Sequence, residues 1–292
     1  MSLLSKKQNI VIGGFAIKLF SKTNVEIGLD LGYESFVVAE EDSKIDAEIE
    51  IIPSIPDELK NEDTLVFETN DDTKKLWHVC SYEDGYKVIV FNPLQPNVIQ
   101  QIAIIFVKSN KWKIYIEQLI NNTVMPLSYP MGPLIMYYLT VANNAIMIHS
   151  SGVIDGEKGR LFSGFSGVGK STMAGIWQKA GHTMINDDRL MLTIENGKVI
   201  MHNSPMFYDD KPKQNQLNAI YLLKQTKENC ITRLIGAEAI SRLLAFCIQH
   251  GYDKMFMEHH LQTIFDVYST IPIYELGFKP DSDIIDFIRL YD

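Results

Sequence analysis

Cysteine is scarce in this sequence, and the three residues of this type are far apart. Cys80, Cys230 and Cys247 are odd in number, and no two of them have the close spacing of metal ligands. A secreted disulfide framework is therefore not expected, because such frameworks need paired cysteines in a short chain. The sequence favours reduced thiols and a cytoplasmic location.

Long runs of Lys and Arg are missing as well, and acidic residues outnumber basic ones. The 292-residue chain has 36 Asp and Glu against 27 Lys and Arg, which gives a formal net charge of −9 at pH 7. A negative surface disfavours general binding to nucleic acid or to anionic lipid headgroups. We therefore expect neither a nucleic-acid partner nor a membrane partner.

The sequence also lacks an apolar run long enough to cross a bilayer. Residues 10–20 follow a Lys pair and superficially resemble a secretion signal. Gly13, Gly14 and Lys18 interrupt the segment, and no clean cleavage site follows it. We interpret it as a β-strand.

Residues 1–128 consist of short apolar or alternating segments separated by turn residues, which is typical of β-strands. No segment in this part predicts a helix of ordinary length. We expect a mostly β domain whose role the sequence does not indicate. The expected strands are residues 10–20, 35–39, 47–52, 64–67, 86–91, 102–107 and 112–116.

The pattern changes in residues 129–292, which predict a second domain of α/β type. Pro133 suits the first turn of a helix over residues 132–142, and Asn143 suits its end. The Gly-containing turn at residues 155–159 predicts an antiparallel hairpin. Further expected helices are residues 171–179, 237–249, 253–268 and 281–290, and expected strands are residues 145–154, 160–163, 183–186, 190–194, 198–202, 219–223 and 273–278.

Residues 164–171 match the phosphate-loop pattern G-x-x-x-x-G-K-[ST] without a mismatch. Glycines let successive backbone N–H groups turn toward phosphate oxygens, and the following helix adds the positive end of its dipole. Lys170 would reach the β- and γ-phosphates, and the Ser171 hydroxyl would coordinate Mg²⁺. The pattern thus predicts a nucleoside triphosphate and Mg²⁺ as cofactors. The residues expected to bind the nucleotide are Gly164, Ser166, Gly167, Val168, Gly169, Lys170, Ser171 and Thr172.

Asp187 and Asp188 come directly after the expected strand at residues 183–186. In a parallel sheet, the end of that strand would lie beside the phosphate loop. One carboxylate could then hold Mg²⁺ while the other accepts a proton from an attacking hydroxyl. The alternative is an acidic turn that only ends a strand.

His149 lies on the first strand of the expected hairpin, whose second strand leads into the loop. That placement would bring the imidazole near the phosphates, as a metal ligand or as a group that orients one. From spacing alone, a purely structural histidine is an equal alternative.

These residues resemble those of the HPr kinase and phosphoenolpyruvate carboxykinase group. The resemblance lies in residues 148–153 (IHSSGV), residues 164–171 and residues 186–189 (NDDR), which follow one another at the group's spacing. The chain looks most like the HPr kinase-like proteins that include the peptide serine kinases of lasso-peptide pathways. The resemblance covers about residues 130–290. It implies a P-loop nucleotide-binding core with a mixed sheet flanked by helices.

The resemblance implies an ATP-dependent kinase that transfers the γ-phosphate to a hydroxyl, expected to be a Ser, of a peptide or protein. It gives Lys170 and Ser171 phosphate and Mg²⁺ roles, and Asp187 and Asp188 the roles of metal ligand and base. It also makes His149 a catalytic residue rather than a structural one.

Two sequence differences from the group bear on the expected acceptor and on the direction of the reaction. HPr kinases usually carry Glu where this chain has Thr172, and their later Gly-rich signature has no counterpart here. HPr itself and the reverse reaction are therefore not expected. A carboxykinase is disfavoured because those enzymes are much longer and need additional substrate-binding Arg residues. A nucleotide-sensing module without catalysis and a kinase for a small metabolite are the alternatives, and a homo-oligomer is compatible with the sequence.

Overall fold

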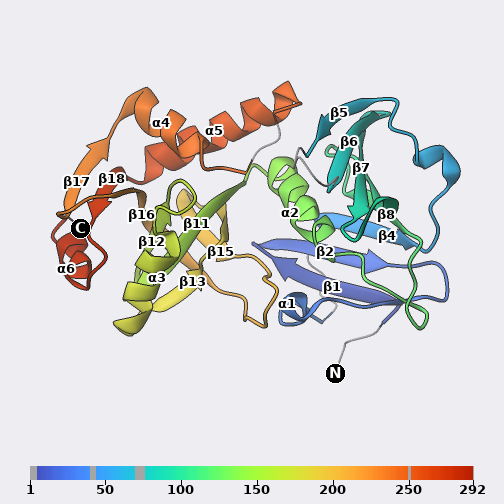
Figure 1. Ribbon diagram of the computed structural model, residues 1–292, viewed down its shortest axis with the longest axis horizontal. Helices are drawn as coiled ribbons and strands as arrows, with labels where there is room; N and C mark the ends of the chain where they lie inside the picture. Colours follow the sequence, from blue (N-terminus) through green and yellow to red (C-terminus); the bar gives the residue numbers. More distant parts are fainter. Residues whose placement is uncertain (1–4, 40–43, 70–75, 249–250, 292) are drawn as a thin grey trace. The chain divides into compact units, whose positions relative to one another are not determined.

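The computed structural model describes residues 5–39, 44–69, 76–248 and 251–291, and Figure 1 traces the chain. The chain divides into two compact units. Unit 1 comprises residues 1–142 and 205–211, and unit 2 comprises residues 143–204 and 212–292. The sequence places a boundary at residue 128, before the helix α2 (Met131–Ala142), whereas the structure groups this helix with unit 1. Ten of the twelve residues of this helix are buried.

Unit 1 contains a mixed sheet in the order β1-β2-β4-β9-β8-β7-β6-β5. The β2–β4 and β4–β9 pairs are parallel, and the other pairs are antiparallel. A separate parallel pair joins β10 to β3. The elements are β1 (Lys7–Ile12), β2 (Phe15–Phe20), β3 (Glu26–Ile27), α1 (Leu31–Glu34), β4 (Ala47–Ile52), the 3₁₀-helix η1 (Asp57–Leu59), β5 (Leu65–Glu68), β6 (Trp77–Tyr82), β7 (Gly85–Asn92), β8 (Gln95–Ile105), β9 (Lys111–Ile116) and β10 (Thr123–Val124).

Three expectations for unit 1 need correction. Residues 10–20 form a hairpin and not one strand, because Gly13 and Gly14 adopt positive φ angles of 61° and 82° and turn the chain back. In residues 35–39, only Val37 forms a β-bridge, to Ile10. Strand β6 was not predicted, because three consecutive buried residues at its centre break the alternation of a half-buried strand.

Unit 2 is built on a second mixed sheet with two long strands, β11 (Ile146–Asp155) and β16 (Gln214–Gln225). The path through this sheet is β12-β11-β14-β15-β16-β18-β17, with β13 paired to β11 and β12 also paired to β16. Its other elements are β12 (Lys158–Ser163), α3 (Lys170–Lys179), β13 (Thr183–Asn186), β14 (Arg189–Glu195), β15 (Lys198–Asn203), β17 (Cys230–Leu234), α4 (Gly236–Leu244), α5 (Lys254–Thr270), β18 (Ile273–Phe278) and α6 (Asp283–Arg289).

Helices cover both faces of the unit 2 sheet, as the side-chain alternation along its strands shows. Leu161 and Ile220 point into one apolar core, which α4 and α5 complete. Their chain neighbours Phe162 and Tyr221 point into a second core, which α3 and α6 complete. The structure therefore has a mixed sheet flanked by helices, as the resemblance implies, accompanied by a mostly β unit.

The hairpin expected around residues 155–159 is confirmed. Strands β11 and β12 pair antiparallel from Ser150 and Ser163 to Asp155 and Lys158, and Gly156 takes a φ of 63° in the turn. The helix expected over residues 237–249 ends earlier, at Leu244, and its last expected residue lies outside the described residues. Among the described residues, no helix has the length and apolar character needed to cross a membrane.

Candidate functional site

The segment between β12 and α3 has a backbone that only glycines adopt easily. Gly164, Gly167 and Gly169 have φ angles of 153°, 78° and 108°. A Cβ at Gly169 would lie 2.8 Å from Cζ of Phe278, so a larger residue would collide there. The glycine spacing in the sequence therefore reflects both backbone conformation and close packing.

The amino end of α3 offers backbone N–H groups to an anion. Gly169 is the N-cap residue and has no side chain with which to satisfy them. Ser166, Gly167, Ser171 and Thr172 are exposed, whereas Val168 is half-buried. Unsatisfied N–H groups and the positive end of the helix dipole together attract negative charge to such a site.

Lys170 is buried, and its ammonium group folds back onto the loop. The Nζ atom donates hydrogen bonds to the carbonyl oxygens of Gly164 at 3.0 Å and Phe165 at 3.2 Å. Burial lowers the pKa of Lys170, and the negative charge of Asp188 opposes that shift. Asp188 and Lys170 are thus close enough to interact electrostatically.

Asp188 is half-buried and lies between two basic side chains. Its Oδ1 is 3.4 Å from Nδ1 of His149, and its Oδ2 is 3.2 Å from Nε of Arg189. The hydrogen bond from His149 is the main reason that the pKa of Asp188 lies below its usual range, although burial acts in the opposite direction. The carboxylate is therefore ionised at neutral pH.

Strand β11 brings these residues together, in a way that differs from the sequence argument. Strands β12 and β13 are not parallel neighbours, because β11 lies between them and pairs antiparallel with both. Both strands consequently run in the same direction and finish at the same end of the sheet. His149 lies opposite Arg189, and the Ser150 amide donates to the Asp188 carbonyl at 3.0 Å.

Asn186 fixes the turn that carries the two carboxylates, a role that the sequence analysis did not assign to it. Its Oδ1 accepts from the backbone N–H groups of Asp187 at 2.7 Å and Asp188 at 3.0 Å. Its Nδ2 donates to the carbonyl oxygen of Ser204 at 3.1 Å. Among the described residues, the Asp187 carboxylate has no hydrogen-bond or ion-pair partner, so it remains open to a ligand.

Two buried serines tie the hairpin to the loop and to α3. The Ser151 hydroxyl donates to the Lys170 carbonyl at 2.9 Å, and the Ser163 hydroxyl donates to the His149 carbonyl at 2.8 Å. The sequence offers a signal for this role, since small polar residues follow His149 inside an otherwise apolar strand. These bonds hold the backbone at His149 and Lys170, whose side chains each interact with Asp188.

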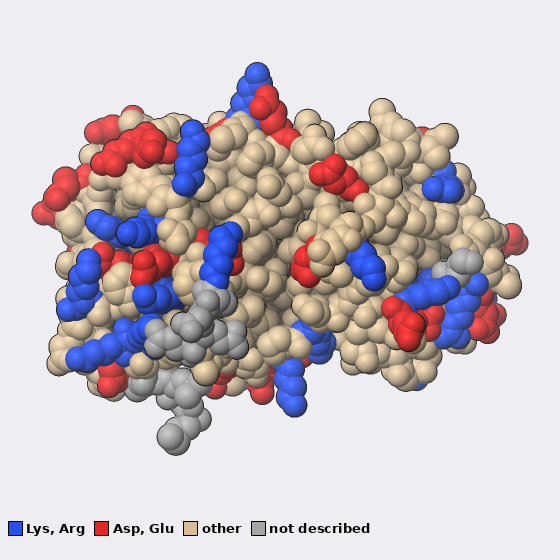
Figure 2. Space-filling model, turned by 180° about the vertical axis from the view of Figure 1, so that it is seen from behind, with Lys and Arg blue, Asp and Glu red and all other residues tan. Residues whose placement is uncertain are grey.

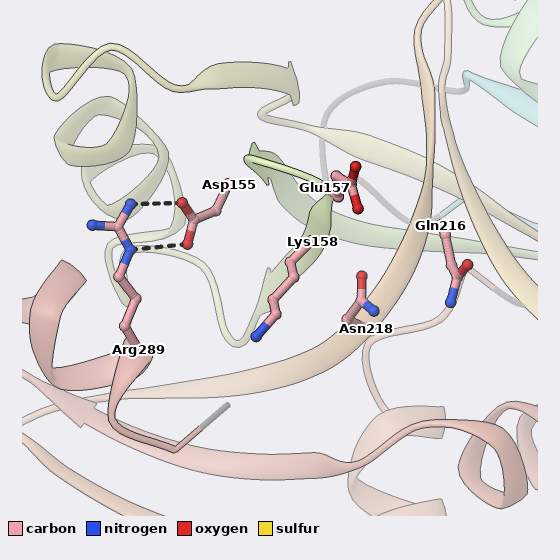
Figure 3. Close-up of a pocket in the computed structure, with 6 residues that line it drawn as sticks. All are labelled: Asp155, Glu157, Lys158, Gln216, Asn218 and Arg289. Atoms are coloured by element: carbon pink, nitrogen blue, oxygen red, sulfur yellow. Dashed lines mark hydrogen bonds and ion pairs between the residues drawn. The ribbon is translucent and has the colours of Figure 1, made fainter.

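A polar hollow in unit 2 has none of the predicted site residues in its lining (Figure 3). It has a volume of about 650 Å³. Asp155 and Arg289 bind each other there, with an Nη2–Oδ1 distance of 2.6 Å, so much of their charge is already compensated. The lining residues are Asp155, Glu157, Lys158, Gln216, Asn218 and Arg289.

Charge on the surface is mixed where it can be seen. Figure 2 shows Lys and Arg side chains interspersed with Asp and Glu side chains on one face of the molecule. A single broad positive patch, as expected of a general nucleic-acid-binding surface, is not visible on the part of that face that the structure describes.

Comparisons with known proteins find similarity among solved structures. No protein-family profile matches the chain, and no curated protein matches its sequence. Among solved structures, the HPr(Ser) kinase/phosphatase from Coxiella burnetii is similar, with 13% identity and a TM-score of 0.32 over 50% of this chain and 95% of that chain. Similarity at this level does not establish a shared activity, so the function has to be argued from the residues of this chain.

Proposed function

We propose that this protein is an ATP-dependent kinase that transfers the γ-phosphate to a hydroxyl group, expected to be a Ser, of a peptide or protein. The observation that carries the proposal is the grouping of a glycine-rich loop, Lys170, Asp188 and His149 at one end of the unit 2 sheet. Each group has a role in phosphoryl transfer, which depends mainly on positioning and electrostatic stabilisation.

The loop and the first turn of α3 would hold the phosphates. The backbone N–H groups of residues 164–172 would surround the phosphate oxygens, and the positive end of α3 would stabilise their charge. Lys170 would leave the carbonyl oxygens of Gly164 and Phe165 and bind the β- and γ-phosphates. Its burial supports this role, because a desolvated cation interacts strongly with an anion.

Mg²⁺ would be held by the Ser171 hydroxyl and by a carboxylate, which we assign to Asp187. Among the described residues, no group of three or more His, Cys, Asp and Glu side chains could hold a metal ion alone. This finding fits Mg²⁺, which typically uses one or two carboxylates and completes its shell with substrate phosphates and water. When bound, the ion would neutralise charge on the phosphates.

Asp188 is our candidate for the proton acceptor. Its carboxylate lies near Lys170 and therefore near the expected position of the γ-phosphate. It is ionised at neutral pH, and the hydrogen bond from His149 orients it. In the proposed step, the oxygen of the acceptor hydroxyl bonds to the γ-phosphorus, and Asp188 takes the proton of that hydroxyl. At the same time, the bond between the γ-phosphorus and the oxygen of the leaving ADP breaks.

The proposal is tested by transfer of radiolabelled γ-phosphate from ATP, with Mg²⁺, into small peptides encoded beside this protein's gene. We expect Asp188→Asn to lower the transfer rate by about 10²-fold or more, the usual contribution of a general base, while ATP binding changes little. Lys170→Met should abolish ATP binding. Asp266→Asn, a matched change on α5, should leave both unaffected.

Two outcomes would contradict the proposal. Normal transfer by the variant carrying both Asp187→Asn and Asp188→Asn would exclude the assigned roles of the two carboxylates. Tight, Lys170-dependent ATP binding without transfer to any of these peptides would favour a nucleotide-sensing module instead.

A further inference from the structure

A small cavity in unit 1 lies far along the chain from the residues assigned to phosphoryl transfer. Its volume is about 170 Å³, which corresponds to about five or six water-sized groups. The cavity is bordered by strand β8, the end of β9, the segment after β9 and the residue before α1. The lining residues are Asp30, Gln100, Gln101, Ile116, Gln118, Ile120, Thr123, Met125 and Ser128.

A β-bulge on β8 turns two adjacent glutamines toward this cavity. Val90 of β7 pairs with Gln101 and Phe91 pairs with Ile99, so Gln100 is an extra residue on β8. Adjacent side chains on a regular strand point to opposite faces, whereas a bulge re-aims one of them. The bulge therefore explains how Gln100 and Gln101 can both line the cavity.

The two glutamines contribute hydrogen-bond acceptors that lack donors. Gln101 is 2% exposed, and its Nε2 donates to the Met125 carbonyl at 2.9 Å, which fixes the amide orientation. The Oε1 atoms of Gln100 and Gln101 are buried and have no hydrogen-bond partner among the described residues. Buried acceptors are nearly always satisfied in folded proteins, so these two indicate a missing donor.

Asp30 adds the only formal charge among the lining residues. Burial raises the pKa of Asp30, since desolvation disfavours the charged form. Among the described residues, its carboxylate has no hydrogen-bond or ion-pair partner, and no Lys or Arg lines the cavity. The site therefore offers acceptors and a negative charge, but no cation that would bind an anion.

We propose that this cavity binds the ammonium end of an alkylamine, with Asp30 as its counter-charge and the Gln100 and Gln101 amide oxygens as acceptors. An ammonium group has three N–H donors and no acceptor, which matches three unpartnered acceptor groups. Ile116, Ile120 and Met125 supply apolar surface for the alkyl chain. The volume suits a chain of a few carbon atoms.

The test uses n-butylammonium and the full-length protein labelled with ¹⁵N, without nucleotide. We expect saturable shifts of the β8 amide signals at millimolar concentration, as is usual for a ligand of this size. Asp30→Asn should weaken binding by about tenfold or more, because it removes the counter-charge but keeps the side-chain shape. Asp84→Asn, a matched change in the β6–β7 turn, should bind as the unchanged protein does.

Two further measurements keep the proposal open to refutation. Gln100→Met, which replaces the amide with an apolar group of similar length, should weaken binding several-fold. Butan-1-ol should bind more weakly than butylammonium, because it has one donor and no charge. Equal binding of the alcohol, or equal binding to the Asp30→Asn variant, would show that charge does not determine binding and would overturn the proposal. No saturation at about 100 mM would overturn it as well, because the cavity would then not bind the amine.

A parallel titration distinguishes the sources of such a group. Lysine blocked at both its amino and carboxyl termini presents the same ammonium on a peptide side chain. Binding at least as tight as that of butylammonium would assign the cavity to lysine in a polypeptide, and binding of butylammonium alone would assign it to a free amine. Neither result depends on the proposed kinase activity, because the titrations contain no nucleotide.

Discussion

Asp155, at the carboxyl end of β11, binds two arginines that lie far apart in the sequence. Its Oδ2 accepts from Nη2 of Arg160 at 2.8 Å, and its Oδ1 accepts from Nη2 of Arg289 at 2.6 Å. Arg160 is 1% exposed, and its guanidinium lies 5.2 Å from the centre of the Trp177 ring. These hydrogen bonds, with that of Arg289 the strongest influence, lower the pKa of Asp155 to about 2.

This pKa predicts a specific loss of stability in acid. Because the folded pKa lies below the unfolded value of 3.8, the pairing stabilises the protein fully above about pH 5. The contribution, about 2 kcal/mol, is lost as the pH falls from about 4 to 2. The Asp155→Asn variant should therefore have a lower free energy of unfolding than the unchanged protein at pH 7. Urea denaturation should show this difference shrinking as the pH falls from about 4 to 2.

A control for this prediction exists on the same arginine. Asp286 is 89% exposed and lies 3.7 Å from Arg289, so Asp286→Asn should change stability by less than about 0.5 kcal/mol. A difference between Asp155→Asn and the unchanged protein that stays constant with pH would contradict the prediction.

At the scale of elements, two helices of unit 2 begin in different ways. Asp253 caps α5, and its side chain accepts from the backbone N–H groups of Met255 at 2.6 Å and Phe256 at 3.4 Å. Helix α3 begins at Gly169, which offers no such oxygen. A side chain thus satisfies two of the first N–H groups of α5, whereas no side chain caps α3.

Asp253→Ala should lower the free energy of unfolding by about 1 kcal/mol, because it removes the acceptor for two N–H groups at the start of α5. Asp253→Ser should recover most of that loss, since Ser also caps helices well. Ser282 precedes α6, but its side chain makes no cap bond, so Ser282→Ala should change stability by less than about 0.5 kcal/mol. Thermal or chemical denaturation of the three variants tests this order, and equal effects of the two alanine changes would contradict it.

At the scale of the whole molecule, the chain leaves unit 2 and returns to unit 1 for a few residues. Residues 205–211 belong to unit 1. There the Ser35 hydroxyl donates to Oδ1 of Asp209 at 2.7 Å, and Gly32 packs tightly against the backbone of Met206. The two units are therefore not simply consecutive in the sequence.

Gly32→Ala should destabilise unit 1, because a Cβ at this position would lie 1.5 Å from the Met206 carbonyl oxygen. The backbone must shift to relieve the collision, which costs about 1–3 kcal/mol. We expect faster proteolytic cleavage within residues 205–211 and a lower unfolding free energy. Gly175→Ala is the matched control: nothing lies within 4 Å of its Cβ, and alanine is favoured in a helix. Equal cleavage rates of the two variants would contradict this role of Gly32.

The strongly patterned parts of the sequence predict the fold best. The turn at residues 155–159 and the alternation in β4 both match the structure, because they depend on local geometry. Strand β6 was not predicted, and residues 10–20 were predicted as one strand although they form a hairpin. In β6, burial by distant residues hides the alternation of apolar and polar residues that marks a strand. In residues 10–20, the turn at Gly13 and Gly14 divides one apolar run into two strands.

By itself, the sequence determined the residues that the site needs: glycines where φ must be positive, a lysine at the start of a helix, and an aspartate pair after a strand. It did not determine which of these residues meet. Pairing with β11 brings His149 to Asp188, and Asn186 orients the turn that carries the aspartates. The strands β12 and β13 are not parallel neighbours, as the sequence argument expected, because β11 lies between them. Only the tertiary structure decided these contacts, because hydrogen bonding between strands joins residues whose separation along the chain carries no signal of their distance in space.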